Sequence, residues 1–199
     1  MKLGILGGTF DPPHRGHLVL AERCAMVLGL DRVLFVPSFR PPHKPQRDLS
    51  PFAARVEMTR LAIADEARFQ VLALEENRGG PSYTVDMLAD LLLLYRGDIL
   101  WLLLGQDSLI DLPDWKDPQR ILSLVRIAVY GRPGVTGLVP GWLRSSVTFV
   151  EGPLVDISSR ELRMRVRQGD VGGMVAGCVL DLIRREGLYA KEKSSHDSQ

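Results

Sequence analysis

The chain has 199 residues, of which 45% are hydrophobic, and its formal net charge is +1. This length suits one α/β domain with a substantial core, and the near-zero charge gives no basis for nonspecific binding to nucleic acid or to a membrane. The two cysteines, Cys24 and Cys178, both lie in helical patterns, which indicates buried free thiols and neither a disulfide framework nor a zinc cluster. The first residues lack the apolar core of a signal peptide, so we expect a cytoplasmic protein.

The first predicted elements are a strand over 3–6 and a helix that begins near Gly16. Between them lies the stretch Gly7-Gly8-Thr9-Phe10-Asp11-Pro12-Pro13-His14-Arg15-Gly16-His17. A strand, a glycine turn and a helix in this order aim unpaired backbone N–H groups and the positive helix end at one point above the sheet, where a phosphate binds well. His14 and His17 can both hydrogen-bond to that phosphate, and Gly16 between them leaves room for it.

A purely structural interpretation of this stretch is also available. The glycines then only form a tight turn, Asp11-Pro12 only ends the strand, and the two histidines only cap the helix. The number of such signals within one short stretch favours phosphate binding over this alternative.

A second strand is predicted over 33–36, which completes a right-handed βαβ unit. The segment 38–47 follows, and its prolines forbid a regular element. Positive charge is concentrated there on Arg40, His43, Lys44 and Arg47. This loop is either a solvated proline linker or an anion-binding loop, and its position after a strand of an α/β sheet favours anion binding.

Ser50-Pro51 predicts a helix start, with Ser50 as the N-cap, and the helix runs to about Asp65. The third strand is predicted over 69–74. The next helix opens at Ser82-Tyr83-Thr84, where backbone N–H groups could bind a carboxylate or a phosphate. Alternatively, Ser82 or Thr84 only caps this helix, and the spacing leaves both interpretations open.

The strongest strand signal is 99–104, an almost continuous apolar run typical of a central parallel strand. This run and the leucines at 91–94 are too short to span a membrane, so both are predicted to be core segments. The strand ends in Gly105-Gln106-Asp107. Asp107 either contacts a ribose or helps to place a metal at the ligand crevice, or it caps the helix that follows.

Trp115 lies in a polar, proline-containing loop, where an indole either fills the core or offers a stacking face to a flat ring. A short helix is predicted over 118–124 and a fifth strand over 125–130, with Arg132 as a cation just beyond that strand. Residues 135–145 are predicted to be irregular, and 147–150 to form a short last strand.

A second motif, Asp156-Ile157-Ser158-Ser159-Arg160-Glu161-Leu162-Arg163, combines helix-capping hydroxyls with arginines that share a helix face with Arg167. Such a helix start makes a second phosphate-binding edge, or it is a capped surface helix with solvated arginines. A last helix is predicted over 171–185, weakened by glycines, and 191–199 is predicted to be a disordered tail.

This order of elements predicts a Rossmann-like, doubly wound parallel sheet of five or six strands in a single domain, 1–190, with a small C-terminal helical part. The helix starts near Gly16 and Ser158 could flank a triphosphate. If a second substrate attacks through a phosphate oxygen that is already anionic, the reaction requires no general base and no covalent enzyme nucleophile.

The stretch 7–17 resembles the signature of nucleotidyltransferases with a His-x-Gly-His motif, and most closely that of the bacterial nicotinate-nucleotide adenylyltransferases. The resemblance implies an enzyme of NAD biosynthesis that joins ATP to nicotinate mononucleotide, with Mg²⁺, and releases pyrophosphate. The near-zero net charge gives no reason to expect a nucleic acid or a membrane as a partner. The metal ligands and a homo-oligomeric state are left open.

The resemblance also implies a role for each residue that matches a family motif. The catalytic set is His14, His17, Lys44 and Arg163. The ATP-binding set is Gly7, Gly8, Thr9, Phe10, Gly16, Gly105, Asp107, Arg132, Ile157, Ser158 and Ser159. The mononucleotide-binding set is Ser82, Tyr83, Thr84 and Trp115, with Thr84 and nearby N–H groups on the pyridine carboxylate and Trp115 stacked on the ring.

The sequence departs from the family pattern at three places. Arg160 stands where a threonine is usual, and Pro13, before the first histidine, constrains the backbone more than some family residues do there. The segment 172–177 is glycine-rich where an aromatic residue and a proline are usual. The acceptor could instead be nicotinamide mononucleotide, flavin mononucleotide or phosphopantetheine. A catalytically silent nucleotide-binding regulator is the alternative from another functional class.

Overall fold

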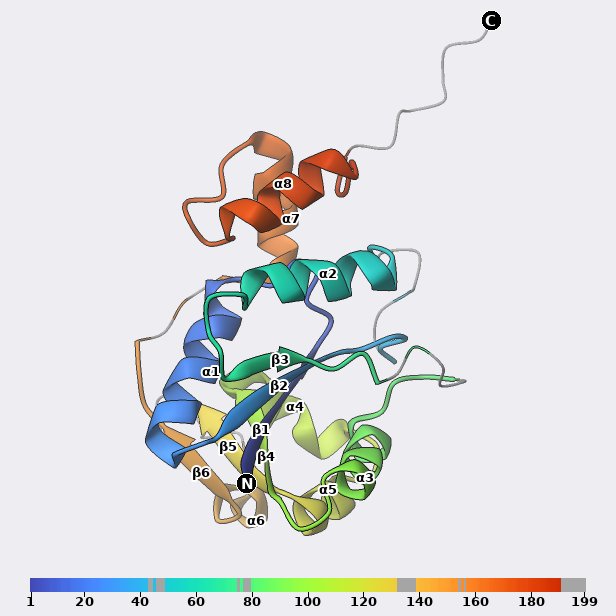
Figure 1. Ribbon diagram of the computed structural model, residues 1–199. Coiled ribbons are helices and arrows are strands. Elements are labelled where there is room, and N and C mark those ends of the chain that lie inside the picture. The colour runs from blue at the N-terminus through green and yellow to red at the C-terminus, as the bar shows by residue number, and fades with distance from the viewer. Residues whose placement is uncertain are drawn as a thin grey trace, which may run out of the picture.

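Within the residues that the computed structural model describes, six parallel strands form one sheet in the order β3-β2-β1-β4-β5-β6 (Figure 1). The described residues are 1–42, 45, 49–74, 76, 80–131, 139–153, 155 and 157–190. The strands are β1 (Lys2–Gly8), β2 (Arg32–Pro37), β3 (Phe69–Val71), β4 (Ile99–Gly105), β5 (Arg126–Tyr130) and β6 (Val147–Val150). The chain moves outward from β1 to β3 and then outward on the other side from β4 to β6, which is the predicted doubly wound order. The reversal of strand order therefore lies between β1 and β4, where such sheets bind ligands.

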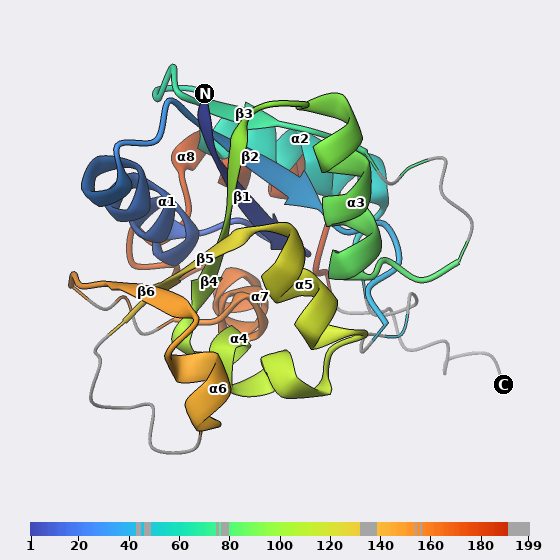
Figure 2. The ribbon, with the colours of Figure 1, turned by 90° about the horizontal axis from the view of Figure 1, so that it is seen from below.

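Helices cover both faces of the sheet (Figure 2). They are α1 (Arg15–Leu28), α2 (Phe52–Ala62), α3 (Thr84–Leu94), α4 (Gln106–Asp111), the 3₁₀ turn η2 (Leu112–Asp114), α5 (Pro118–Leu124), α6 (Gly141–Arg144), α7 (Ser159–Gln168) and α8 (Gly177–Arg185). Neighbouring residues of β4 enter different cores, because Leu102 packs with α3 and α5 whereas Leu103 packs with α1. This is why a central strand reads as a continuous apolar run.

The C-terminal helices form a third, smaller core against α2 (Figure 1). Met58 of α2, Leu162 of α7 and Leu182 of α8 are buried together in it. The predicted C-terminal helical part is therefore confirmed, and it reaches the sheet through α2.

Some predicted boundaries were wrong. The third strand ends at Val71, a four-residue helix occupies Gly141–Arg144 in the segment expected to be irregular, and the last helix begins only at Gly177. Gly172 and Gly173 have φ angles of 52° and 69°, which a right-handed helix does not contain. The predicted tail, 191–199, lies outside the described residues.

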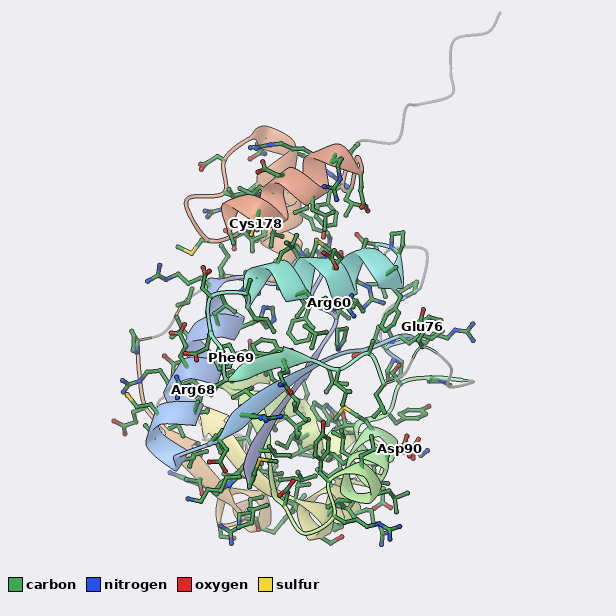
Figure 3. All side chains as sticks on the ribbon, viewed as in Figure 1. Arg60, Arg68, Phe69, Glu76, Asp90 and Cys178 are labelled. Carbon is green, nitrogen blue, oxygen red and sulfur yellow. The ribbon has the colours of Figure 1, made fainter. Side chains whose placement is uncertain are left out.

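Some predicted burial was also wrong. Leu93 and Leu94, expected in the core, are 63% and 60% exposed because they lie on the outer face at the end of α3. Cys24 is buried as expected, but Cys178 is exposed on α8, where its thiol contacts the Leu61 carbonyl at 3.6 Å (Figure 3). No helix within the described ranges is long and apolar enough to cross a membrane.

Candidate active site

The signature loop between β1 and α1 is built around the buried ring of Phe10. Phe10 is 0% exposed and has a φ of 48°, an unusual conformation for a bulky residue. A Cβ on Gly8 would lie 3.2 Å from this ring, so glycine leaves room for it. The ring meets that of His17 edge-on at 5.0 Å. Phe10, which was predicted to lie against a nucleotide, is therefore fully buried, and its ring packs against His17 in the unliganded structure.

His14 and His17 lie together at the start of α1, with ring centroids 3.8 Å apart. The His14 backbone N–H donates to Nδ1 of His17 at 3.2 Å, so the neutral His17 ring carries its proton on Nε2. His17 therefore does cap the start of α1, as the structural interpretation of the stretch predicted. Its Nε2–H is still the donor that a phosphate would require.

His14 is 8% exposed, and burial lowers its pKa to about 4. Its Nδ1 is buried and has no hydrogen-bond partner among the described residues. The His14 ring is therefore neutral at pH 7 in the unliganded protein. A phosphate beside it would raise this pKa again and favour the protonated, hydrogen-bonding form.

Gly16 makes room for the ring of His14, since a Cβ at Gly16 would lie 3.0 Å from Nδ1. We expect Gly16→Ala to move this ring by a few tenths of an ångström and to lower kcat by roughly tenfold. The unfolding free energy is expected to change little. Alanine stabilises a helix by up to about 1 kcal/mol relative to glycine, and this gain offsets the cost of crowding the His14 ring. Steady-state kinetics and urea unfolding check both numbers. Unchanged kcat would show that the placement of His14 does not matter.

The second motif is attached directly to the signature loop. Ser159 donates from Oγ to the Pro12 carbonyl at 3.0 Å, and Arg163 donates from Nη1 to the Asp11 carbonyl at 2.8 Å. Ser158 caps α7 by accepting the Glu161 N–H at 3.2 Å, as the sequence predicted. Two segments about 150 residues apart are thereby held at one place.

The arginines of α7 do not form the shared solvated face that the sequence suggested. Arg163 is half-buried against the signature loop, to which it donates its hydrogen bond. Arg167 donates to the Tyr189 carbonyl at 2.7 Å, and Arg160 is exposed. Ile157 is half-buried against the C-terminal core. Of the three arginines, Arg163 is the one that the structure brings to the signature loop.

Asp11 does more than end the strand. Its carboxylate is fully buried, and it accepts hydrogen bonds from the Tyr189 hydroxyl at 2.6 Å and from the Ser50 N–H at 3.1 Å. Burial and the negative charge of Asp11 raise the pKa of Tyr189, which keeps the phenol protonated as a donor. Ser50 was expected to cap α2, but Pro51 holds the N-cap position. Sequence reasoning missed this connection because its partners are far apart in the chain.

The predicted mononucleotide side lies at the start of α3. The N-cap there is Tyr83, without a side-chain hydrogen bond, so neither Ser82 nor Thr84 caps the helix. The Oγ of Ser82 instead accepts the Arg40 N–H at 2.8 Å, and the Ser82 N–H donates to the Arg40 carbonyl at 2.8 Å. The loop after β2 is thereby joined to this helix start.

Trp115 is half-buried and packs against the core that contains α3 and α5. The next residue, Lys116, lies 4.5 Å from the centre of the Tyr83 ring and forms an ion pair with Asp86 at 2.9 Å. The structure thus brings the Trp115 loop to the start of α3. Both interpretations of Trp115 are compatible with this position, because part of the indole is covered and part is exposed.

The end of β4 contributes Gly105 and Asp107. Gly105 is the N-cap of α4, so the capping role considered for Asp107 was wrong, and Asp107 is exposed in the first helical turn. Gly7 is exposed at the end of β1, and Thr9 is half-buried. The predicted site residues Lys44 and Arg132 lie outside the described residues.

The cytidylyltransferase-like family matches residues 5–165 of the chain. A curated relative from Roseiflexus sp. (strain RS-1), named "Probable nicotinate-nucleotide adenylyltransferase", is 44% identical over 195 residues, which cover 94% of this chain and 97% of the relative. A relative of the same name from Thermus thermophilus is 43% identical over 190 residues, which cover 95% of this chain and 100% of the relative. Among solved structures, a Plasmodium falciparum nicotinic acid mononucleotide adenylyltransferase complexed with NaAD shares the fold, with a TM-score of 0.79 and 19% identity, covering 94% of this chain and 97% of that chain.

Proposed function

Because the chain belongs to the nicotinate-nucleotide adenylyltransferases, within the cytidylyltransferase-like family, we propose that it transfers the adenylyl group of ATP to nicotinate mononucleotide. The products are nicotinic acid adenine dinucleotide and pyrophosphate. The observation that supports this most is the junction of the two motifs, in which Ser159 and Arg163 hold the α7 start against the loop that carries His14 and His17. We place the reaction in the cytoplasm, because both substrates are charged nucleotides.

In the proposed mechanism, the mononucleotide phosphate attacks the α-phosphorus of ATP in line, and pyrophosphate leaves. The attacking oxygen is anionic at neutral pH, so no general base is required. Holding the two substrates in line can supply roughly 7–11 kcal/mol of the barrier reduction. His14, His17 and Lys44 are proposed to stabilise the charge on the transferring phosphoryl group and the pyrophosphate.

Mg²⁺ is proposed to enter as part of MgATP. The described residues contain no cluster of three or more His, Cys, Asp or Glu side chains that could hold a metal. Mg²⁺ keeps several waters and binds readily through substrate phosphates. In that form it would neutralise charge on the triphosphate, and Asp107, exposed in the first turn of α4, is the carboxylate that we propose as a further ligand.

Pyrophosphate exchange tests the proposed direct transfer. Labelled pyrophosphate should enter ATP only when nicotinate mononucleotide or its dinucleotide product is present. Exchange with ATP and Mg²⁺ alone would indicate a covalent adenylyl-enzyme. Absence of exchange under every condition would contradict adenylyl transfer itself.

Trp115 is proposed to stack on the pyridine ring, with Thr84 and neighbouring N–H groups on its carboxylate. Stacking on an aromatic side chain is worth about 1–3 kcal/mol, so Trp115→Ala is expected to raise the KM for nicotinate mononucleotide roughly tenfold and to leave the KM for ATP nearly unchanged. Trp142, which is 41% exposed on α6, provides the control, and Trp142→Ala should change neither constant. An unchanged KM for the mononucleotide in Trp115→Ala would remove the stacking role.

A further inference from the structure

Arg55 is a buried arginine in the first turn of α2. It is 1% exposed, and its guanidinium donates to four backbone carbonyls. Nε contacts the Ser50 carbonyl at 3.1 Å, Nη1 contacts those of Thr9 and Ser38 at 2.9 and 2.7 Å, and Nη2 contacts that of Phe39 at 3.3 Å. A buried guanidinium is tolerated only when its N–H groups are satisfied, and here the partners come from distinct backbone segments.

These carbonyls belong to segments that carry the proposed substrate contacts. Thr9 lies in the signature loop, just before Phe10 and the histidine pair. Ser38 and Phe39 begin the loop after β2, and Ser50 ends the same loop. Ser38 also donates its own N–H to the Gly8 carbonyl at 2.9 Å, so the signature loop and the loop after β2 are joined both directly and through Arg55.

The connection continues to the mononucleotide side. Arg40 follows Phe39 directly, and it exchanges two hydrogen bonds with Ser82 at the start of α3, both of 2.8 Å. One guanidinium therefore lies between the segment expected to hold ATP and the segment that leads to the expected pyridine carboxylate site.

We propose that Arg55 is a positioning residue that sets the ATP-binding loop and the mononucleotide-binding segment at the spacing that in-line attack requires. The identity of the two substrates in this statement rests on the proposed function. Arg55 is buried, and its guanidinium holds the two segments through their backbone carbonyls. Each segment can still bind its own ligand when Arg55 is changed, but the two ligands lose their mutual alignment, so kcat is affected more than either KM.

Arg55→Lys is the informative substitution. Lysine keeps the positive charge, but its donors radiate from a single nitrogen and cannot span carbonyls that the planar guanidinium reaches from three nitrogens. A displacement of about 1 Å in an aligned site lowers the rate by roughly 100-fold. We therefore expect kcat to fall about 100-fold, while the KM values for ATP and for the mononucleotide change less than about threefold.

A structural measurement without substrate accompanies the kinetics. The N–H of Ser38 donates to Gly8, and the N–H of Ser50 donates to Asp11, so hydrogen exchange at these amides reports on both ends of the loop. In Arg55→Lys both amides should exchange faster, whereas the amides of the central strand β4 should keep their protection.

Val56→Ala is the matched control. Val56 is the next residue of α2 and is also buried. Its aliphatic side chain has no hydrogen-bond donor for the loop carbonyls. Val56→Ala should lower the Tm and leave kcat and the exchange of the Ser38 and Ser50 amides unchanged. Arg55→Ala supplies a rescue test, since millimolar guanidinium ion should restore part of its kcat and should not accelerate Val56→Ala.

The outcomes separate this inference from the proposed function. If Arg55→Lys keeps the kcat of the unchanged protein, or lowers only the Tm as Val56→Ala does, the positioning role is wrong. If the unchanged protein releases no pyrophosphate with nicotinate mononucleotide, the proposed function fails, and the amide exchange measurement still decides whether Arg55 holds the two loops.

Discussion

Replacing His17 with alanine is expected to lower kcat by roughly 10²–10³-fold, because one preorganised donor to the transferring phosphoryl group is removed. The Nδ1 of His17 accepts the His14 N–H, and its ring rests edge-on against Phe10. The ring is thus held in one orientation with its other nitrogen as the donor. The lost cap should lower the free energy of unfolding by only about 1 kcal/mol. Pyrophosphate release and urea unfolding measure the two effects.

His17→Gln is the control that separates capping from chemistry. His17 is the third residue of α1, where glutamine is a natural capping-box partner for the N–H of the N-cap residue. We expect His17→Gln to recover most of the lost stability and little of the lost kcat. If glutamine restores activity together with stability, His17 acts only as a cap.

Replacing Asp11 with alanine is expected to give the largest loss of stability, about 3 kcal/mol. The substitution leaves the Tyr189 hydroxyl and the Ser50 N–H without the buried carboxylate that they contact at 2.6 and 3.1 Å. An unsatisfied buried donor costs about 1–3 kcal/mol. Urea unfolding at constant pH measures the loss, with Tyr189→Phe as the partner variant.

A double-mutant cycle tests whether the two groups act through their hydrogen bond. The effect of Asp11→Ala should be smaller in the Tyr189→Phe background, by at least about 0.5 kcal/mol, because the hydroxyl is already absent. A loss below about 1 kcal/mol in Asp11→Ala would show that the carboxylate does not hold the C-terminal segment to the signature loop.

The sheet could be predicted because its strands are continuous apolar runs and its turns carry strong local signals. The helix 118–124 was predicted at its observed ends, since Asp117 caps it and Pro118 occupies its first position. The third strand was predicted too long because its end depends on another strand. β2 ends at Pro37, and proline has no N–H to continue the ladder with the residues beyond Val71.

The location of the candidate site was also predictable, because the motifs follow strands whose carboxyl ends meet at one edge of the sheet. The hydrogen bonds that hold the motifs together could not be predicted. Arg55 looks like one more arginine of an amphipathic helix, and nothing in its neighbours shows that it donates to carbonyls of Thr9 and Phe39. Every residue has a backbone carbonyl, so the sequence does not show which carbonyls accept hydrogen bonds from distant side chains. Those contacts are seen only in the structure.

The most direct test of the account is pyrophosphate release from ATP and Mg²⁺, with nicotinate mononucleotide, nicotinamide mononucleotide, flavin mononucleotide and phosphopantetheine offered separately. We expect selective turnover with nicotinate mononucleotide, which requires both the phosphate site at His14 and His17 and a carboxylate site near Thr84. Turnover with another acceptor alone would contradict the carboxylate site. Nucleotide binding without turnover of any acceptor would contradict the enzymatic function and favour a nucleotide-binding regulator.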